Sequence, residues 1–325
     1  MTSAAAFHQG IYQSGLVRRL ARWLDATPHP SVAIEISAER IAVARWNHAR
    51  LLEEFAVENL PPGTIVPSAV ETNVVNSAPA KTAVNKACDR VRAHDEEVAL
   101  IIPDPVIRVF VQHFEDFPRS SEEAIPLLRW KLKKSVPFEA DETIISYFRQ
   151  APREEGVDIV TALGRLRVIR EYETLAEGAD LYAGVVVSSS LAAISLLDEE
   201  KPMLLARISG TALTTAIVRS GVLCGYRCTE LPAHGGDLTP QMLMEEIFPV
   251  AAYFQDTWHE GISSVRIAGL GSRLSEFAPA MEQEFHCHVR SLLDAARSEG
   301  RISDDARQLA DRDLEGLVGW TAHNS

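Results

Sequence analysis

The fold is predicted most directly by residues 31–58, which read SVAIEISAERIAVARWNHARLLEEFAVE. Apolar side chains alternate with smaller or polar ones from Val32 to Ile36, and the alternation resumes at Ile41. A period of two is typical of half-buried β-strands, and Ala38-Glu39-Arg40 and Asn47-His48 mark turns between them. The stretch therefore predicts a three-stranded antiparallel meander.

The same pattern returns in the second half of the chain. Strands are predicted at 203–209, 213–218 and 222–228, with turns at Gly210-Thr211 and at 219–221. Alignment of the two meanders matches Glu35 with Arg207 and Ser37 with Ser209. Such internal duplication predicts two related α/β lobes that face each other across a cleft. Two unrelated domains that each begin with a meander are the weaker alternative, because both tight turns fall at matching points.

Further elements are predicted around the meanders from apolar periodicity and from capping residues. Ser120 and Glu123 have the spacing of a capping box, and they precede a helical pattern that ends before Pro137. The other expected helices are 79–94, from about 165, 189–199, 239–258 and 272–285, and the other expected strands are 98–102, 106–113, 143–149, 157–163, 183–188 and 264–268.

Residues 1–30 differ from the rest of the chain. Apolar residues recur there at helical spacing, with Arg18, Arg19 and Arg22 between them, and Pro28 ends the pattern. This predicts a short basic amphipathic helix. It could lie on an anionic membrane surface or a partner, or it could fold back on its own domain.

Composition narrows the class of protein. The chain has 325 residues, a net charge of −13, 46% hydrophobic and 24% charged residues, as in ordinary soluble proteins. The acidic balance argues against a nucleic-acid partner. Neither a stretch of about 18 apolar residues nor a secretory signal is recognised, so a cytoplasmic location is expected. Cys224, Cys228, His286 and His288 could form a zinc site, but reduced thiols and ordinary histidines are favoured.

Several short stretches carry a resemblance to a known family. They are LPPGTI at 60–65, ALIIPDP at 99–105, the segment from Phe117-Pro118 to Glu142, GGDLT at 235–239 and IAGLGSRL at 267–274. In this order they resemble the PilM family of type IV pilus assembly, from about residue 31 to the end. The resemblance implies an α/β, actin-like ATPase fold related to FtsA, with two duplicated ribonuclease-H-like lobes and a small inserted α+β subdomain.

The resemblance also implies a division of the chain. Residues 1–30 are expected as the basic extension and 98–165 as the inserted small subdomain. The first lobe is expected in two parts, 31–97 and 166–200, and the second lobe at 201–325.

The resemblance places a nucleotide site at the two hairpins, and both depart from the family's pattern. Working members of the superfamily read roughly G-[IL]-D-[IL]-G-[ST] in the first hairpin and D-[IV]-G in the second. This chain has AIEISA at 33–38, which keeps an acid as Glu35, and RISG at 207–210. A guanidinium at Arg207 reverses the charge where magnesium would be organised. Arg207 could pair with Glu35, it could contact phosphate directly, or both residues could be solvated.

The glycines expected on the far side of the nucleotide are retained, although each alone could be an ordinary turn glycine before a helix. They keep ATP as a candidate ligand, while no cofactor, catalytic residue or metal site is assigned outright. The candidate cofactor-binding residues are Glu35, Ser37, Arg207, Ser209, Gly210, Gly235, Gly236, Gly269 and Gly271.

By resemblance, the expected function is that of a non-catalytic scaffold. PilM-like proteins form a cytoplasmic platform that is peripheral to the inner membrane through its partners. They bind a short N-terminal peptide of PilN, a bitopic membrane protein, between the first lobe and the inserted subdomain, here roughly 98–150. Other pilus platform proteins and a second copy of the chain are further expected partners. The alternatives are an active Mg-ATP-binding actin-like ATPase of pilus or cell-division type, and a cytoplasmic recruitment module of a type II secretion platform.

Overall fold

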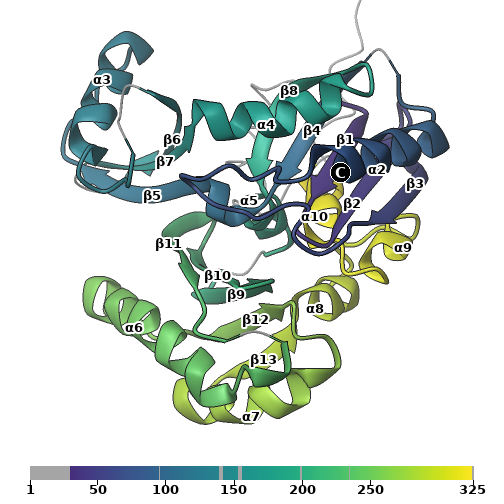
Figure 1. Cartoon of the computed structure of the whole chain (residues 1–325). Helices are drawn as coiled ribbons and strands as arrows, with labels where there is room; N and C mark the ends of the chain where they lie inside the picture. The colour runs from purple at the N-terminus through teal and green to yellow at the C-terminus, as the bar shows by residue number, and fades with distance from the viewer. Residues whose placement is uncertain are drawn as a thin grey trace, which may run out of the picture.

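The computed structural model describes residues 30–94, 96–138, 142–152, 156–197, 200–233 and 235–323. The helix predicted within residues 1–30 lies outside the described residues, apart from Pro30. Figure 1 shows two stacked lobes, with the small subdomain at one end of the first. No helix in the described part of the chain is long and apolar enough to cross a membrane.

The first lobe is built on a five-stranded sheet with the order β3-β2-β1-β4-β8. Its first three strands form the predicted antiparallel meander, and β4 and β8 continue the sheet in parallel with β1. Helices α2 (Ser77–Val91) and α4 (Leu166–Glu177) pack on this sheet. The strands are β1 (Val32–Ile36), β2 (Arg40–Trp46), β3 (Leu52–Asn59), β4 (Glu96–Ile102) and β8 (Leu181–Ser188).

The second lobe repeats that design in the order β11-β10-β9-β12-β13. The meander is again antiparallel, and β12 and β13 again run parallel to its first strand. The predicted duplication is therefore confirmed by strand order and direction. The elements are β9 (Met203–Ser209), β10 (Ala212–Arg219), β11 (Val222–Glu230), β12 (Ser264–Ala268), β13 (His288–Ser291), α6 (Pro240–Trp258) and α7 (Leu274–Phe285).

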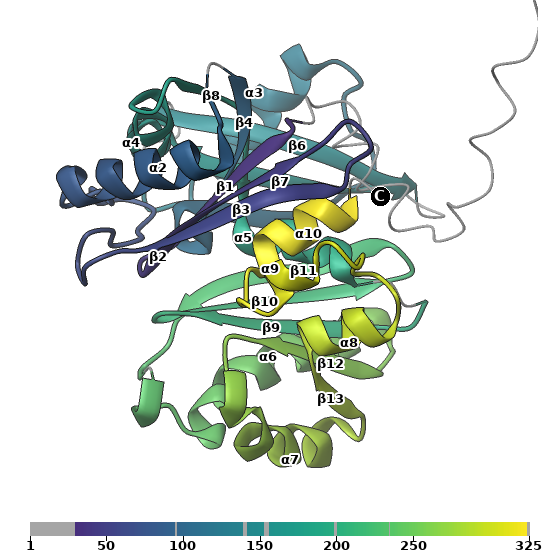
Figure 2. The same cartoon turned by 90° about the vertical axis from the view of Figure 1, so that its right-hand side faces the viewer.

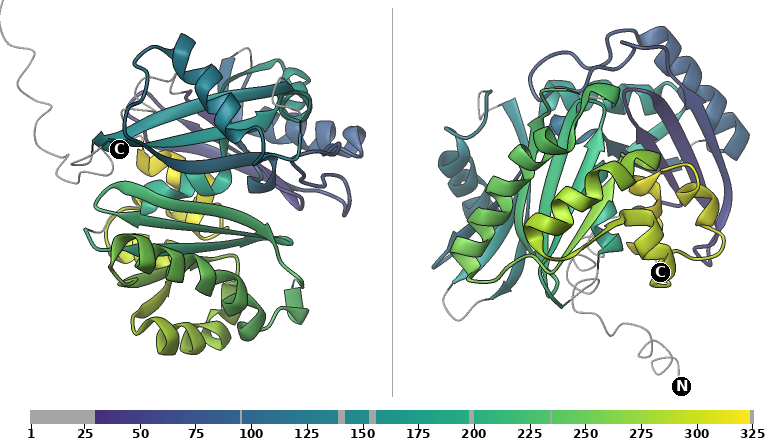
Figure 3. Two further views of the ribbon diagram at one scale, coloured as in Figure 1. Left: turned by 90° about the vertical axis from the view of Figure 1, so that its left-hand side faces the viewer. Right: turned by 90° about the horizontal axis from the view of Figure 1, so that it is seen from below.

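The inserted subdomain has a three-stranded sheet, β5-β7-β6, and helix α3 (Ser121–Leu132) covers its outer face (Figure 3, left). The strands are β5 (Ile107–Phe114), β6 (Thr143–Pro152) and β7 (Val157–Arg165). The predicted cap of α3 is confirmed, because the Ser120 hydroxyl accepts a hydrogen bond from the Glu123 amide. The expected boundary at residue 98 is wrong. It falls inside β4, whose apolar residues pair with β1 and β8, so the small sheet begins at Ile107.

Short helices fill the space between the two large sheets (Figure 2). They are α5 (Ser189–Ala193), which continues as the 3-10 turn η3 (Ile194–Leu196), and the C-terminal helices α8 (Leu292–Ser298), α9 (Arg307–Ala310) and α10 (Glu315–His323). A side chain at Gly319 would overlap the Ala192 carbonyl, so α10 and α5 are in close contact. The helix expected at 189–199 is α-helical only to Ala193 and continues as a 3-10 turn to Leu196.

The C-terminal helices correct the expected limits of the second lobe. Leu317, Val318 and Trp320 of α10 are buried, and α10 packs against α5 and β1 of the first lobe. The chain thus returns to the first lobe before residue 325, because the apolar face of α10 is covered there.

The small subdomain is also joined to the second lobe. The buried Gln150 side chain, at the end of β6, donates to the Leu223 carbonyl at 2.8 Å and accepts from the Leu223 amide at 2.7 Å. One side chain thus satisfies both backbone groups of a residue in β11, and it fixes the small sheet against the second large sheet.

Candidate functional site

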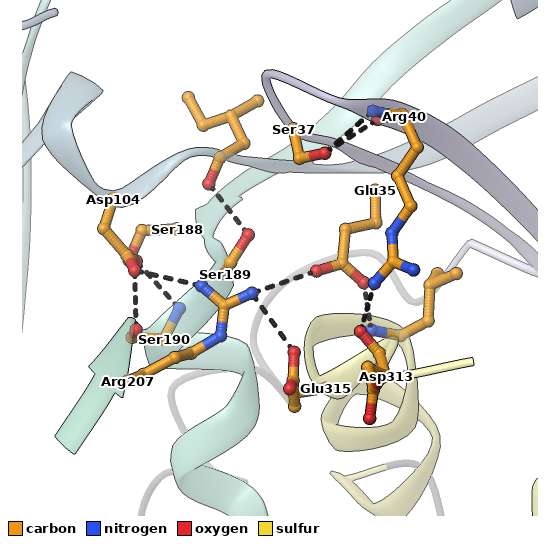
Figure 4. Close-up of polar contacts among 12 residues, drawn as sticks. Glu35, Ser37, Arg40, Asp104, Ser188, Ser189, Ser190, Arg207, Asp313 and Glu315 are labelled. Carbon is orange, nitrogen blue, oxygen red and sulfur yellow. Dashed lines mark hydrogen bonds and ion pairs between the residues drawn. The ribbon is translucent and has the colours of Figure 1, made fainter. Parts of the chain in front are cut away.

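Four charged side chains meet between the lobes, where the two matching strands β1 and β9 end (Figure 4). The Arg207 guanidinium lies 3.5 Å from Glu35, 3.2 Å from Asp104 and 3.3 Å from Glu315. None of these side chains is more than 8% exposed. We call these four residues the Arg207 cluster. It joins the second lobe, through β9, to the first strand, the end of β4 and the start of α10.

Asp104 is the best-satisfied acid of the cluster. It lies in the 3-10 turn η1 (Asp104–Val106), and its carboxylate accepts hydrogen bonds from the Ser190 amide at 2.8 Å and the Ser190 hydroxyl at 2.6 Å. The hydroxyls of Thr214 and Tyr226 also donate to it, at 3.0 and 3.3 Å. A buried carboxylate is costly unless it is paired and hydrogen-bonded, and Asp104 meets both conditions.

Glu35 is held by the N-terminus of α10. Its Oε2 accepts the Leu317 amide at 3.0 Å, so the carboxylate satisfies one of the free amides of the first helical turn. Gly316 makes this approach possible, because a Cβ there would lie 2.7 Å from Oε1 of Glu35. The end of β1 and the start of α10 are therefore hydrogen-bonded to each other, and Gly316 leaves the space that this contact needs.

The charged groups of the Arg207 cluster differ in how well their charges are compensated. Burial alone lowers the pKa of the Arg207 guanidinium, but Glu315, Asp104 and Glu35 outweigh burial and raise that pKa overall. Burial, and then the charge of Glu315, raise the pKa of the Glu35 carboxyl although Arg207 and the Leu317 amide oppose the shift. Three carboxylates share a single guanidinium in the cluster, and Glu35 is the one whose charge is least well compensated.

Of the alternatives left open by the sequence, the structure has the ion pair of Arg207 with Glu35. The interpretation of both as solvated strand residues is wrong, since both side chains are buried. Sequence reasoning missed Asp104 and Glu315. Asp104 left a signal, because it is a lone acid between two prolines at the end of an apolar strand. The sequence gives no comparable signal for Glu315, because this residue follows a polar run of mixed charge.

The residues present do not fit a magnesium ion. In place of the second carboxylate that would help to organise the cation, a guanidinium already occupies the space between three acids. A divalent cation would have to displace a group of like charge. The arrangement therefore supports no step that depends on a metal.

The first hairpin is closed on itself. The Ser37 hydroxyl accepts the amides of Glu39 at 3.3 Å and Arg40 at 3.1 Å, and it donates to the Arg40 carbonyl at 3.1 Å. In a phosphate-binding hairpin such amides would point at the ligand. Here the side chain that replaces a glycine satisfies them.

A cavity of about 360 Å³ opens beside the cluster. Seven of the nine candidate residues line it: Glu35, Ser37, Arg207, Ser209, Gly210, Gly235 and Gly269. Gly271 lines an adjoining cavity of about 270 Å³, and Gly236 is absent from the lining of both.

The charge of this cavity is unsuited to a polyphosphate. Its walls carry the acids Glu35, Glu39, Asp313 and Glu315 and the two guanidinium groups of Arg40 and Arg207. Arg40 donates to the backbone carbonyls of Arg312, at 2.7 Å, and of Asp313. Both cations are thus already engaged by the protein, and the lining is net acidic.

Gly269 has a structural reason to be glycine. It follows β12 with φ of +87°, and a Cβ at this position would overlap the carbonyl oxygen of Ile208 in β9. Gly271, in the turn η5 (Gly271–Arg273), also has positive φ but faces open space. Gly235 begins the turn η4 (Gly235–Asp237), and its carbonyl accepts from Arg273.

The cysteines have no metal-binding arrangement around them. Within the described ranges, no group of three or more His, Cys, Asp or Glu residues could hold a metal ion. Burial, and then the charge of Asp104, raise the pKa of the Cys228 thiol to about 12, so this thiol stays protonated at neutral pH.

Two sheets of identical strand order, with the ends of their first strands meeting at one buried site, define a two-lobed protein of actin-like fold. More particularly, the fold is PilM-like. The chain superposes on a chain of the "PilM-PilN type IV pilus biogenesis complex" with a TM-score of 0.72 and 15% identity, covering 91% of this chain and 98% of that one.

Two further solved structures are similar at lower scores. One is a Bacteroides thetaiotaomicron protein described as having an actin-like ATPase fold, with a TM-score of 0.47, 11% identity and coverage of 90% of this chain and 97% of that one. The other is the cytoplasmic domain of EpsL from the type II secretion system of Vibrio cholerae, with a TM-score of 0.42, 12% identity and coverage of 73% and 80%. No protein-family profile matches the sequence, and no curated protein matches it.

Proposed function

We propose that this protein is a cytoplasmic scaffold of a type IV pilus inner-membrane platform. It binds the N-terminal peptide of a PilN-like bitopic membrane protein, and it does not hydrolyse ATP. The fold shared with a chain of a PilM–PilN complex supports the first part of the proposal. The second part rests on one observation, the buried Arg207 cluster at the place where the superfamily organises its metal.

The cluster removes two requirements of phosphoryl transfer. Hydrolysis needs a cation that neutralises developing charge and amides that position the phosphates. Both terminal nitrogens of Arg207 are engaged by internal carboxylates, and the Ser37 hydroxyl engages the amides of the first hairpin. The lobes are therefore held together by the protein's own charges, in the role that a metal-bound nucleotide would otherwise fill.

The proposed binding site for the partner peptide is the outer edge of β6. Among the described strands, β6 pairs only with β7, so it is an edge strand of the small sheet, beside which an extended segment could add as a further strand. Ile144 on β6 is 42% exposed, and Leu166, directly after β7, is 43% exposed. These side chains offer apolar contacts beside the free edge.

A loop of the first lobe lies beside the start of β6 and would form the other side of the proposed peptide site. Arg165 donates to the Val70 carbonyl at 2.9 Å and pairs with Glu142 at 2.8 Å, which brings the loop after β3 to the base of β6. Val66 and Val75, in the same loop, are 49% and 61% exposed. An extended peptide with apolar side chains on alternate positions fits such a site.

Calorimetric titration tests both halves of the proposal. We expect heat of binding from a synthetic N-terminal peptide of a PilN-like protein and none from Mg-ATP. Ile144→Arg should abolish peptide binding, while Leu51→Arg, at a residue 51% exposed next to β3, should leave it unchanged. Tight Mg-ATP binding with phosphate release would overturn the scaffold assignment, and peptide binding unaffected by Ile144→Arg would overturn the placement of the peptide site.

A further inference from the structure

Helix α3 carries an exposed aromatic side chain within a group of basic residues. Trp130 is 76% exposed, the highest value among the exposed large hydrophobic residues of the described chain. Arg129, Lys131, Lys133 and Lys134 surround it in sequence, although the whole chain has a net charge of −13. An exposed indole with four basic residues beside it in the sequence is unusual on a strongly acidic protein.

The end of α3 brings two of these lysines near Trp130. Lys133 is the C-cap residue of α3 and keeps helical backbone angles, so it follows Trp130 at the spacing of neighbours on a helix surface, and Lys134 lies in the turn directly after it. The opposite face carries Ala124, Leu128 and Leu132, which are buried. The side chain of Trp130 therefore points away from the small sheet.

The lysines near Trp130 have different local roles. The Lys131 ammonium lies 3.9 Å from the centre of the Phe114 ring and donates to the His113 carbonyl at 3.5 Å. Lys133 and Lys134 are exposed, and no ion pair joins either of them to another residue in the described part of the chain.

We propose that the face formed by Trp130, Lys133 and Lys134 binds directly to an anionic lipid bilayer. An indole prefers the boundary between hydrocarbon and headgroups, and lysines beside it keep their ammonium groups among lipid phosphates. Basic groups at a membrane surface are attracted to anionic lipids within a Debye length.

The shape of the surface favours a bilayer over an acidic peptide. Figure 1 shows α3 at the outer end of the small subdomain, and none of its residues lines either cavity described above. A peptide needs a groove to receive its side chains, whereas a protruding indole on a convex helix suits a planar surface. The nearest acids of the helix, Glu122 and Glu123, lie in its first turn, roughly 16 Å along the axis from Lys134.

This inference goes beyond the proposed function, in which the membrane is reached only through a partner. It stands on α3 alone, so it can fail while peptide binding at β6 succeeds, and the reverse. The probes are vesicles of phosphatidylglycerol mixed with phosphatidylcholine, and vesicles of phosphatidylcholine alone, without any partner peptide.

Co-sedimentation with these vesicles tests the proposal. We expect the full chain to bind the anionic vesicles and to be released by salt. Lys133→Glu with Lys134→Glu should lower the apparent affinity at least about tenfold, because four units of charge change at the surface. The matched control, Lys81→Glu with Lys201→Glu, changes the same net charge at exposed lysines outside the small subdomain and should bind like the wild type.

Insertion of the indole has its own readout. Brominated anionic lipids should quench part of the tryptophan fluorescence of the wild type, and Trp130→Phe should remove that quenching although the other four tryptophans remain. Equal binding to both kinds of vesicle, unchanged binding after the double reversal at 133 and 134, or binding to polyglutamate in place of vesicles would each overturn the proposal. Unchanged thermal unfolding of the variants shows that they are folded.

Discussion

Glu35 and Arg207 hold matching positions in the two duplicated sheets and lie 3.5 Å apart across the interface between the lobes. Corresponding positions of the two duplicated sheets therefore carry side chains of opposite charge, and these meet as an ion pair. The guanidinium can therefore join the lobes without a cation from solution. Asp104 and Glu315 complete the same contact from the first lobe and from α10.

Loss of the guanidinium should be severe. Arg207→Met leaves three buried carboxylates without a counter-charge, and we expect the free energy of unfolding to fall by about 3–5 kcal/mol. Urea denaturation measures the change. Arg227→Met is the matched control, since Arg227 pairs with Glu246 at the surface and its removal should cost less than about 1 kcal/mol. Equal losses for the two variants would contradict a special role for the buried cluster.

Replacement of the guanidinium by a carboxylate should create dependence on a divalent cation. In Arg207→Asp, four acids would share the site, and Mg²⁺ or Ca²⁺ should raise the melting temperature by binding only the folded state. Arg207→Lys retains a cation and should show no such response. Melting curves of Arg207→Asp that are indifferent to both metals would count against the cluster as a substitute for a metal.

Glu35 should make stability depend on pH. Burial, and then Glu315, raise its pKa in the folded state above the ordinary value of 4.5, so the folded state holds the proton more tightly than the unfolded state. The stability that Glu35 contributes is fully present below pH 4.5, and it is lost as pH rises through the raised pKa of the folded state. Glu35→Gln keeps the acceptor for the Leu317 amide and removes the titration.

Thermal unfolding measured below and above pH 4.5 tests whether Glu35 makes the protein less stable as pH rises. The stability of the wild type should fall relative to that of Glu35→Gln as pH rises above about 4.5. Parallel curves for the two proteins would mean that the Glu35 carboxyl titrates alike in the folded and unfolded chains.

Restoration of nucleotide binding should require both hairpins. Arg207→Asp with Ser209→Gly leaves the amides of the first hairpin engaged by Ser37, so we expect no Mg-ATP binding by calorimetry. Addition of Ala33→Gly and Ser37→Gly frees those amides, and binding should then become measurable. A gain from the second hairpin alone would refute the two-sided loss.

The two glycines after β12 should differ in their tolerance of a side chain. Gly271→Ala meets open space and should cost about 1 kcal/mol for its positive φ. Gly269→Ala adds an overlap with the Ile208 carbonyl and should cost more than about 3 kcal/mol, because β9 and β12 must move apart. Similar unfolding free energies for the two variants would show that this close approach is not required.

The sequence predicts the duplicated fold because alternation and turn residues are local signals. Residues 32–46 and 203–219 contain the information for their own strands, and the matching turns are enough to align Glu35 with Arg207. That alignment is also why their ion pair could be predicted as one of the alternatives.

The rest of the site depends on contacts between distant parts of the chain. Asp104 and Glu315 reach Arg207 only after β4 and α10 are packed, and no local pattern encodes that meeting. The same reason explains the misplaced boundaries. An apolar strand such as β4 does not reveal which sheet it will join, and an apolar helix such as α10 does not reveal which core it will cover.

The crowding of charge around Arg207 also bears on the evolution of the chain. A single mutation back to an acid would strand several buried carboxylates, and a single loss of one acid would still leave the hairpin amides closed by Ser37. Each of these single substitutions therefore either lowers the stability of the protein or leaves the first hairpin closed to phosphate. The buried arginine is therefore difficult to exchange for an acid through single substitutions.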